Sequence, residues 1–221
     1  MNIKAVVFDL DGVITTSSKE HFLAWSKLAR ELGGTLSEHI MDDVKGCSRM
    51  ASLNLVLADI GMADSFTSAQ KIELADRKNH YYADMISKFN PSNIEPGAVE
   101  LFEYFKDNGV KIALGSVSKN APMLLNNMKI TGYFDYVVDP TVVKNAKPAP
   151  DIFLNAANYF GYKPMLCVGI EDAPAGIAAI KSAGMLAVGI GDKKLLSEAV
   201  IVYQTLKDVD IAYIDRLLAK Q

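Results

Sequence analysis

The chain has 221 residues, half of them hydrophobic and 22% charged, which is the balance of a globular protein long enough to bury a sizeable core. The net charge of -3 gives no basic surplus for binding nucleic acid, and no apolar run is long enough to cross a bilayer. The first residues lead directly to Asp9 and do not form a signal peptide. Cys47 and Cys167 are far apart and lack metal-ligand spacing. We therefore expect a cytoplasmic protein with reduced thiols.

The predicted elements begin with a short buried strand over Ile3–Phe8, which is β-branched and apolar and is followed by Asp9 and Gly12. From about Lys19 the apolar residues recur at helical spacing. No strand pattern interrupts residues 19–88, and a turn-like sequence follows near residues 89–92. This stretch therefore predicts a helical unit. Its helical patterns cover residues 19–32, Ser48–Leu57 and Ser68–Ile86.

After Pro96 and Gly97, helix and strand patterns alternate along the chain, which predicts a parallel sheet covered on both faces. The fold class is therefore α/β: a Rossmann-like, doubly wound parallel sheet with an inserted α-helical cap. We expect a core of residues 1–15 and 93–221 and a cap of residues 16–92. The helix patterns are Ala98–Phe105, Ala121–Met128, Ile152–Phe160 and Ala175–Ala183, and the strand patterns are Val110–Leu114, Tyr136–Val138, Met165–Ile170 and Leu186–Ile190.

Polar side chains follow several of the predicted strands, and ligands of open α/β sheets bind outside the carboxyl ends of the strands. Carboxylates are the hard oxygen ligands that Mg²⁺ prefers, and an aspartate can also attack phosphorus. A second carboxylate two residues away can act as the acid and base, while a serine and a lysine bind the transferring oxygens. The residues in question are Asp9, Asp11, Ser116, Lys147, Glu171 and Asp172.

Each of these residues also has an ordinary structural explanation. An aspartate after a strand is often a turn or cap residue, Lys147 before a proline can be a solvated loop residue, and Glu171 with Asp172 can begin a helix. It is the combination, in order on successive strand ends, that favours a magnesium-dependent phosphoryl-transfer site with Asp9 as the nucleophile.

The segment Phe8–Val13, FDLDGV, resembles the signature of the haloacid-dehalogenase-like phosphotransferases. The positions of Ser116, Lys147 and Glu171-Asp172 match the other motifs of that superfamily, and the resemblance spans nearly the whole chain. Within the superfamily the sequence is most similar to the β-phosphoglucomutase family. The segments that carry this finer resemblance are residues 9–15, 21–25, 45–52, 77–79, 116–122 and 147–153.

The resemblance implies a mutase that interconverts β-D-glucose 1-phosphate and glucose 6-phosphate through a bisphosphate. It assigns Asp9 as nucleophile and Asp11 as acid and base, with Asp9, the Asp11 carbonyl, Glu171 and Asp172 around Mg²⁺. Its substrates are a hexose phosphate and bisphosphate, and it suggests a monomer. The substrate-binding residues it implies are His21, Trp25, Lys45, Gly46, Arg49, Ser52, Lys78, Ser116, Val117, Ser118, Lys119, Asn120 and Lys147.

Several of these assignments keep an alternative. His21 can be an ordinary polar position of a helix, Trp25 can belong to the cap core, and Lys45 and Lys78 can be solvated charges. The sequence also departs from its relatives, because Thr16-Ser17 lacks an acid that is common there and Met50-Ala51 replaces a pair that is often acidic. A sugar-phosphate phosphatase therefore remains an alternative function, and a non-catalytic sugar-phosphate-binding protein is a more distant one.

Overall fold

The structure, a computed structural model, describes residues 1–44 and 47–220. The chain divides into two compact units, one of Met1–Thr16 with Asn90–Gln221 and the other of Ser17–Phe89. The divisions thus fall after residues 16 and 89, whereas the sequence patterns put the boundaries after residues 15 and 92. The first unit is the α/β unit and the second is the helical unit.

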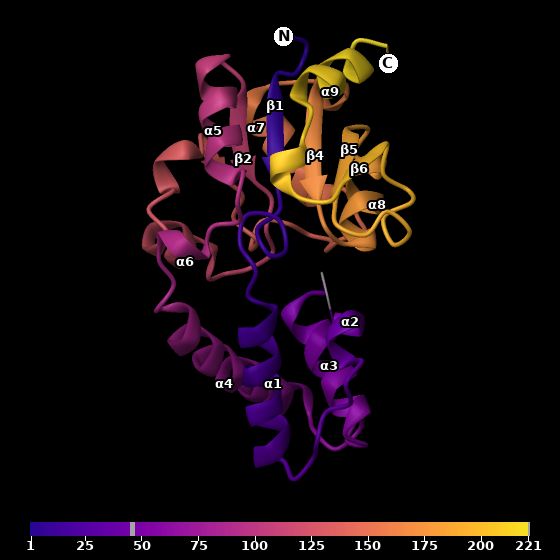
Figure 1. Cartoon of the computed structure of the whole chain (residues 1–221). Coiled ribbons are helices and arrows are strands. Elements are labelled where there is room, and N and C mark those ends of the chain that lie inside the picture. Colours follow the sequence, from indigo (N-terminus) through magenta and orange to yellow (C-terminus); the bar gives the residue numbers. More distant parts are fainter. Residues whose placement is uncertain (45–46, 221) are drawn as a thin grey trace. The chain divides into compact units, whose positions relative to one another are not determined.

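Six strands of the described chain form one parallel sheet in the order β3-β2-β1-β4-β5-β6. The first strand lies in the middle, with Phe8 opposite Leu114 on one side and Ile170 on the other. Because all strands run in the same direction, their carboxyl ends share one edge (Figure 1). The strands are β1 (Ala5–Phe8), β2 (Lys111–Leu114), β3 (Tyr136–Val137), β4 (Cys167–Glu171), β5 (Leu186–Ile190) and β6 (Ile201–Tyr203).

Helices cover both faces of this sheet, and β1 supplies apolar side chains to each of them. Ala5 and Val7 belong to a buried cluster with residues of α7 and α8, while Phe8 meets the rings of Phe102 and Phe105 on α5 at centroid distances of 5.1 and 6.3 Å. Burial on both faces explains why β1 is apolar without alternation. The helices of this unit are α5 (Ala98–Asp107), α6 (Ala121–Asn127), α7 (Asp151–Phe160), α8 (Pro174–Ser182) and α9 (Ile211–Leu218), with 3₁₀ turns η1 (Pro91–Asn93), η2 (Thr131–Tyr133), η3 (Pro164–Leu166) and η4 (Leu206–Asp208).

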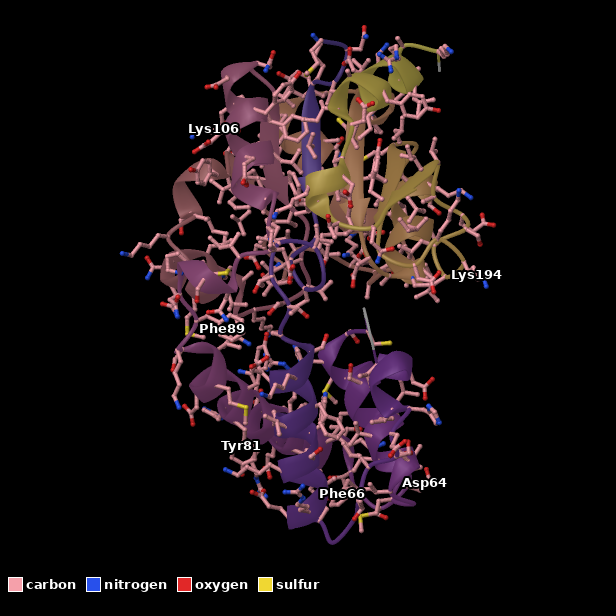
Figure 2. All side chains as sticks on the ribbon, viewed as in Figure 1. Asp64, Phe66, Tyr81, Phe89, Lys106 and Lys194 are labelled. Atoms are coloured by element: carbon pink, nitrogen blue, oxygen red, sulfur yellow. The ribbon has the colours of Figure 1, made fainter. Side chains whose placement is uncertain are left out.

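The helical unit has its own core, in which Trp25 and Leu28 pack with apolar residues of the following helices, and Phe66, labelled in Figure 2, is partly buried against it. The Ser48 hydroxyl accepts from the Ala51 amide and so caps the helix that begins at Arg49. No helix in the described residues is long and apolar enough to span a membrane. The helices are α1 (Ser18–Glu31), α2 (Ile40–Val44), α3 (Arg49–Asp59) and α4 (Ser68–Ile86).

The predicted fold class is confirmed, but three elements have no counterpart in the predicted pattern: α2, β6 and α9. All are short, and β6 lies at the sheet edge with its residues only partly buried. The strand expected from Met165 begins at Cys167, because Pro164–Leu166 forms a 3₁₀ turn in front of it. The expectation that residues 19–88 contain no strand holds for the part of that segment that the structure describes.

Candidate active site

The site begins where β1 ends. The Asp9 amide donates to the Ile170 carbonyl at 2.9 Å, and the Gly115 amide donates to the Phe8 carbonyl at 2.8 Å. These bonds continue the ladder one residue beyond β1 on both of its sides. The backbone of Asp9 is therefore fixed between the ends of β2 and β4, and the residue as a whole is buried, with 8% of its surface exposed.

The turn after Asp9 requires a glycine. Gly12 has a φ of +83°, and a Cβ added there would lie 1.8 Å from Oδ2 of Asp172. The Gly12 amide donates to the Thr15 carbonyl at 2.7 Å, which closes the turn. Glycine thus supplies both the left-handed conformation and the space that lets Asp172 approach the turn carrying Asp11.

Lys147 is the cation at the centre of the site. Its Nζ lies 2.5 Å from Oδ1 of Asp9 and 2.7 Å from Oε1 of Glu171. The side chains of Lys147 and Glu171 are each 2% exposed, so this is a buried pair of ion pairs and not a solvated loop charge. The loop before α7 therefore carries the lysine to the end of β1, as the sequence argument expects for a phosphate-neutralising group.

Glu171 is held on both of its oxygens. Oε2 accepts from the amides of Asp172 and Ala173 at 2.7 and 2.6 Å, while Oε1 accepts from Lys147. A Cβ on Gly176 of α8 would lie 1.9 Å from Oε1, so a glycine is needed where the helix passes the carboxylate. These contacts fix the orientation of Glu171 while leaving lone pairs on its oxygens.

Burial and neighbouring charges shift the pKa values of Asp9 and Lys147. Burial, which is the largest cause, and the charges of Glu171 and Asp172 together raise the pKa of Asp9 to about 8, although Lys147 acts to lower it. Burial by itself would lower the pKa of Lys147, but Asp9 and Glu171 outweigh it and hold that pKa above its usual value. Three buried carboxylates, those of Asp9, Glu171 and Asp172, thus lie close together, and their mutual repulsion favours the binding of a proton or a further cation.

The donor set fits a hard divalent cation. Asp9, Glu171 and Asp172 each offer a carboxylate oxygen, and these oxygens lie within 4.8 Å of one another. Oxygen ligands at a buried, negatively charged site are what Mg²⁺ requires. The structure therefore contains a carboxylate cluster able to hold a metal ion.

The loop after β2 contains the remaining predicted residues of the α/β unit. Ser116 is buried, and its hydroxyl accepts from the Ser118 amide at 3.2 Å. The Asn120 amide donates to the Ser118 hydroxyl at 3.3 Å, while Lys119 is exposed and Val117 is half-buried. Because Leu114 is in register with Phe8, this loop starts at the edge of the sheet where Asp9 lies.

In the helical unit, His21 and Lys78 are in direct contact. Lys78 Nζ lies 2.7 Å from His21 Nδ1, and its ammonium stands 4.5 Å from the centre of the Trp25 ring and 4.8 Å from that of Tyr82. Lys78 is only 4% exposed, so the solvated-charge interpretation of this lysine is wrong. Burial and the Lys78 charge lower the pKa of His21 to about 3. Trp25 itself lies in the core of the helical unit, as its alternative interpretation expects.

Arg49 lies at the start of α3 and is held from α4. Its Nη1 is 3.1 Å from Oδ1 of Asp76, and its Nη2 donates to Oδ1 of Asn79 at 2.9 Å. Ser52, one turn further along α3, is buried. The predicted residues Lys45 and Gly46 lie outside the described residues.

Two partners of these groups are missing from the sequence prediction. The Tyr82 ring lies against that of His21 at a centroid distance of 4.0 Å with the planes tilted by 31°, and its hydroxyl shares a 2.8 Å hydrogen bond with that of Ser17. Asp76 pairs with Arg49. The spacing of Asp76, Asn79 and Tyr82 by three residues on α4 is the signal that could have placed them on one helix face.

Comparison with known proteins agrees with this arrangement. Residues 3–184 match the family model described as haloacid dehalogenase-like hydrolase. A protein of Bacillus subtilis named beta-phosphoglucomutase is 44% identical over 92% of this chain and 90% of its own length. A Thermotoga maritima protein named phosphorylated carbohydrates phosphatase is 27% identical over 89% of this chain and 91% of its own.

Solved structures give the same result. The crystal structure of beta-phosphoglucomutase from Clostridium difficile has a TM-score of 0.94 and 39% sequence identity, and covers 99% of this chain and 98% of that one. The family model, the full-length relatives and the carboxylate cluster at the strand ends all agree, and the chain belongs to the haloacid dehalogenase-like hydrolase family.

Proposed function

We propose that the protein is a β-phosphoglucomutase, which interconverts β-D-glucose 1-phosphate and glucose 6-phosphate through β-glucose 1,6-bisphosphate. The observation that carries this proposal is the 44% identity to the Bacillus subtilis mutase over nearly the whole of both chains. Identity to the Thermotoga maritima phosphatase is 27% over a similar span, so the mutase is favoured over a phosphatase.

Asp9 is the proposed nucleophile. In the phosphorylated enzyme, the C6 hydroxyl of glucose 1-phosphate attacks the phosphorus of Asp9 phosphate and gives its proton to Asp11. The bond from phosphorus to the Asp9 oxygen breaks, which yields the bisphosphate and frees the carboxylate. After the bisphosphate has exchanged ends, Asp9 attacks the phosphorus of the C1 phosphate, the bond from that phosphorus to the C1 oxygen breaks, and Asp11 returns the proton to this departing oxygen. Glucose 6-phosphate is released and Asp9 is phosphorylated again.

Lys147 and Ser116 are the groups proposed to bind the transferring oxygens. The Lys147 ammonium already contacts Asp9, so it lies beside the carboxylate to which the phosphoryl group becomes attached. Positive charge and hydrogen-bond donors that are fixed before the reaction stabilise the charge that develops on those oxygens.

We propose that Asp9, the Asp11 carbonyl, Glu171 and Asp172 hold Mg²⁺. The cluster of three buried carboxylates and the raised pKa of Asp9 support this assignment. When bound, Mg²⁺ would neutralise phosphate charge and orient the phosphoryl group toward the nucleophile. The contacts of Glu171 with two backbone amides keep its carboxylate oriented for that role.

A mutase must also bind the phosphate that is not reacting. We propose that Arg49 binds this second phosphate, because a guanidinium offers a planar set of donors that matches phosphate oxygens. The loop residues Ser118, Lys119 and Asn120 are proposed to assist, with Val117 forming part of the same loop. The helical-unit residues proposed to contact the sugar or to exclude water are His21, Trp25, Lys45, Gly46, Ser52 and Lys78.

The test is phosphorus NMR of the purified protein with β-glucose 1-phosphate, Mg²⁺ and a trace of the bisphosphate. The proposal predicts glucose 6-phosphate, a requirement for the bisphosphate primer, and loss of the product signal in Asp9→Asn. Inorganic phosphate forming faster than glucose 6-phosphate would instead assign a phosphatase. The departure at Thr16-Ser17 is the observation that keeps this second candidate in the test.

A further inference from the structure

The Arg49 guanidinium is held by two different kinds of group on α4. Asn79 accepts from Nη2 with a neutral amide oxygen, and Asp76, one turn earlier on the helix, faces Nη1 with a carboxylate oxygen at 3.1 Å. The Arg49 and Asp76 side chains are 28% and 59% exposed, so this ion pair is accessible to solvent and to a ligand.

The Asp76 carboxylate is not needed merely to orient the Arg49 guanidinium. A guanidinium has five N–H donors in a fixed plane, and the neutral side-chain oxygen of Asn79 already accepts a hydrogen bond from it. A carboxylate beside the guanidinium adds a negative charge that would repel any phosphate approaching the same donors.

A mutase, however, must bind the second phosphate reversibly. Its bisphosphate must exchange ends between the two half-reactions, so whichever group holds the second phosphate has to release it in every cycle. Building on the proposed function, we propose that Asp76 is a positioning residue that competes with the second phosphate for Arg49 and limits the affinity of the enzyme for the bisphosphate.

The size of the effect follows from the charges. One carboxylate a few ångströms from a phosphate in a solvent-exposed setting weakens its binding by roughly tenfold. The Asp76→Asn variant keeps an acceptor oxygen for Nη1 and removes the charge, so we expect it to bind the bisphosphate roughly tenfold more tightly. If Asp76 only oriented the guanidinium, the same change would leave binding unchanged or weaken it.

The experiment measures the dissociation constant of β-glucose 1,6-bisphosphate by calorimetry, with Mg²⁺ present, in an Asp9→Asn background that prevents turnover. Asp76→Asn is compared with Glu31→Gln, which removes another exposed acid of the helical unit. Glu31 pairs with Arg77 and accepts from the hydroxyl of Tyr81, which is labelled in Figure 2. A double-mutant cycle with Arg49→Ala isolates the pair.

The proposal predicts tighter binding in Asp76→Asn, no change in Glu31→Gln, and disappearance of the Asp76→Asn gain when Arg49 is alanine. Equal or weaker binding in Asp76→Asn would overturn it while leaving the mutase assignment intact. A gain that persists without Arg49 would also overturn it, since the effect would then be a general change of charge. If the Asp9→Asn reference itself fails to bind the bisphosphate, the proposed function falls first and this inference falls with it.

Discussion

Replacing Lys147 by methionine removes the only positive charge that the described contacts supply to Asp9 and Glu171, and leaves a side chain of similar length. Removal of one partner from a buried ion pair costs about 3–5 kcal/mol, because the other charge stays buried without compensation. Glu171 keeps its two backbone amides, and Asp9 can take up a proton because its pKa is already about 8. We therefore expect the lower end of that range, a loss of about 3 kcal/mol in the free energy of unfolding.

The matched control is Lys111→Met. Lys111 also lies 2.7 Å from a carboxylate, that of Asp135, but its side chain is 46% exposed. Exposed pairs contribute about 0–1 kcal/mol, so the two lysines separate burial from pairing. Urea unfolding in the presence of a chelator gives the free energy of unfolding of both variants. Trp25 fluorescence reports on the helical unit, and circular dichroism reports on the whole chain. A loss for Lys147→Met no larger than that for Lys111→Met would refute the reasoning.

Two further predictions concern His21 and Gly12. The pKa of His21 is about 3 in the folded protein and about 6.5 when unfolded, so the unfolded chain binds the proton more readily and stability is lost as the pH falls below 6.5. Between pH 7 and 5 this loss is about 1 kcal/mol after allowing for screening at a half-buried site, and urea titrations should show it in the wild type but not in His21→Gln. Gly12→Ala should abolish activity, because its Cβ would meet Asp172, and should destabilise the fold more than Gly33→Ala, which has a φ of +84° but no atom within 4 Å. Equal losses of stability in the two glycine variants, measured by thermal unfolding, would contradict the clash.

The sequence was sufficient to predict the fold class and the main elements, because the long helices and the fully buried strands carry clear periodicity. The helix Ser68–Ile86 and the strand Leu186–Ile190 have the predicted bounds. The short helix Ile40–Val44 and the edge strand Ile201–Tyr203 cannot be predicted in this way, because each has too few residues to show a reliable period.

For the site, the sequence predicted the residue types and the edge of the sheet, but not the pairings. Lys147 meets Asp9 across 138 residues of sequence, and only the parallel topology brings them together. The burial of Lys78 likewise cannot be predicted from the sequence, because nothing in a helical lysine indicates that a histidine and two further aromatic rings will surround it. The sequence gives no sign of the pair between Asp76 and Arg49 either, because the two residues lie on different helices.

The most direct test of the central claim is a single-turnover experiment on the Asp9 phosphate. The enzyme is first phosphorylated with a labelled phosphoryl donor, freed of excess donor, and mixed with β-glucose 1-phosphate, and the products are separated after a rapid quench. The account predicts that the label moves to the sugar, as the bisphosphate and then glucose 6-phosphate, and that Asp9→Asn carries no label. Label recovered as inorganic phosphate, at the same rate with and without the sugar phosphate, would contradict it.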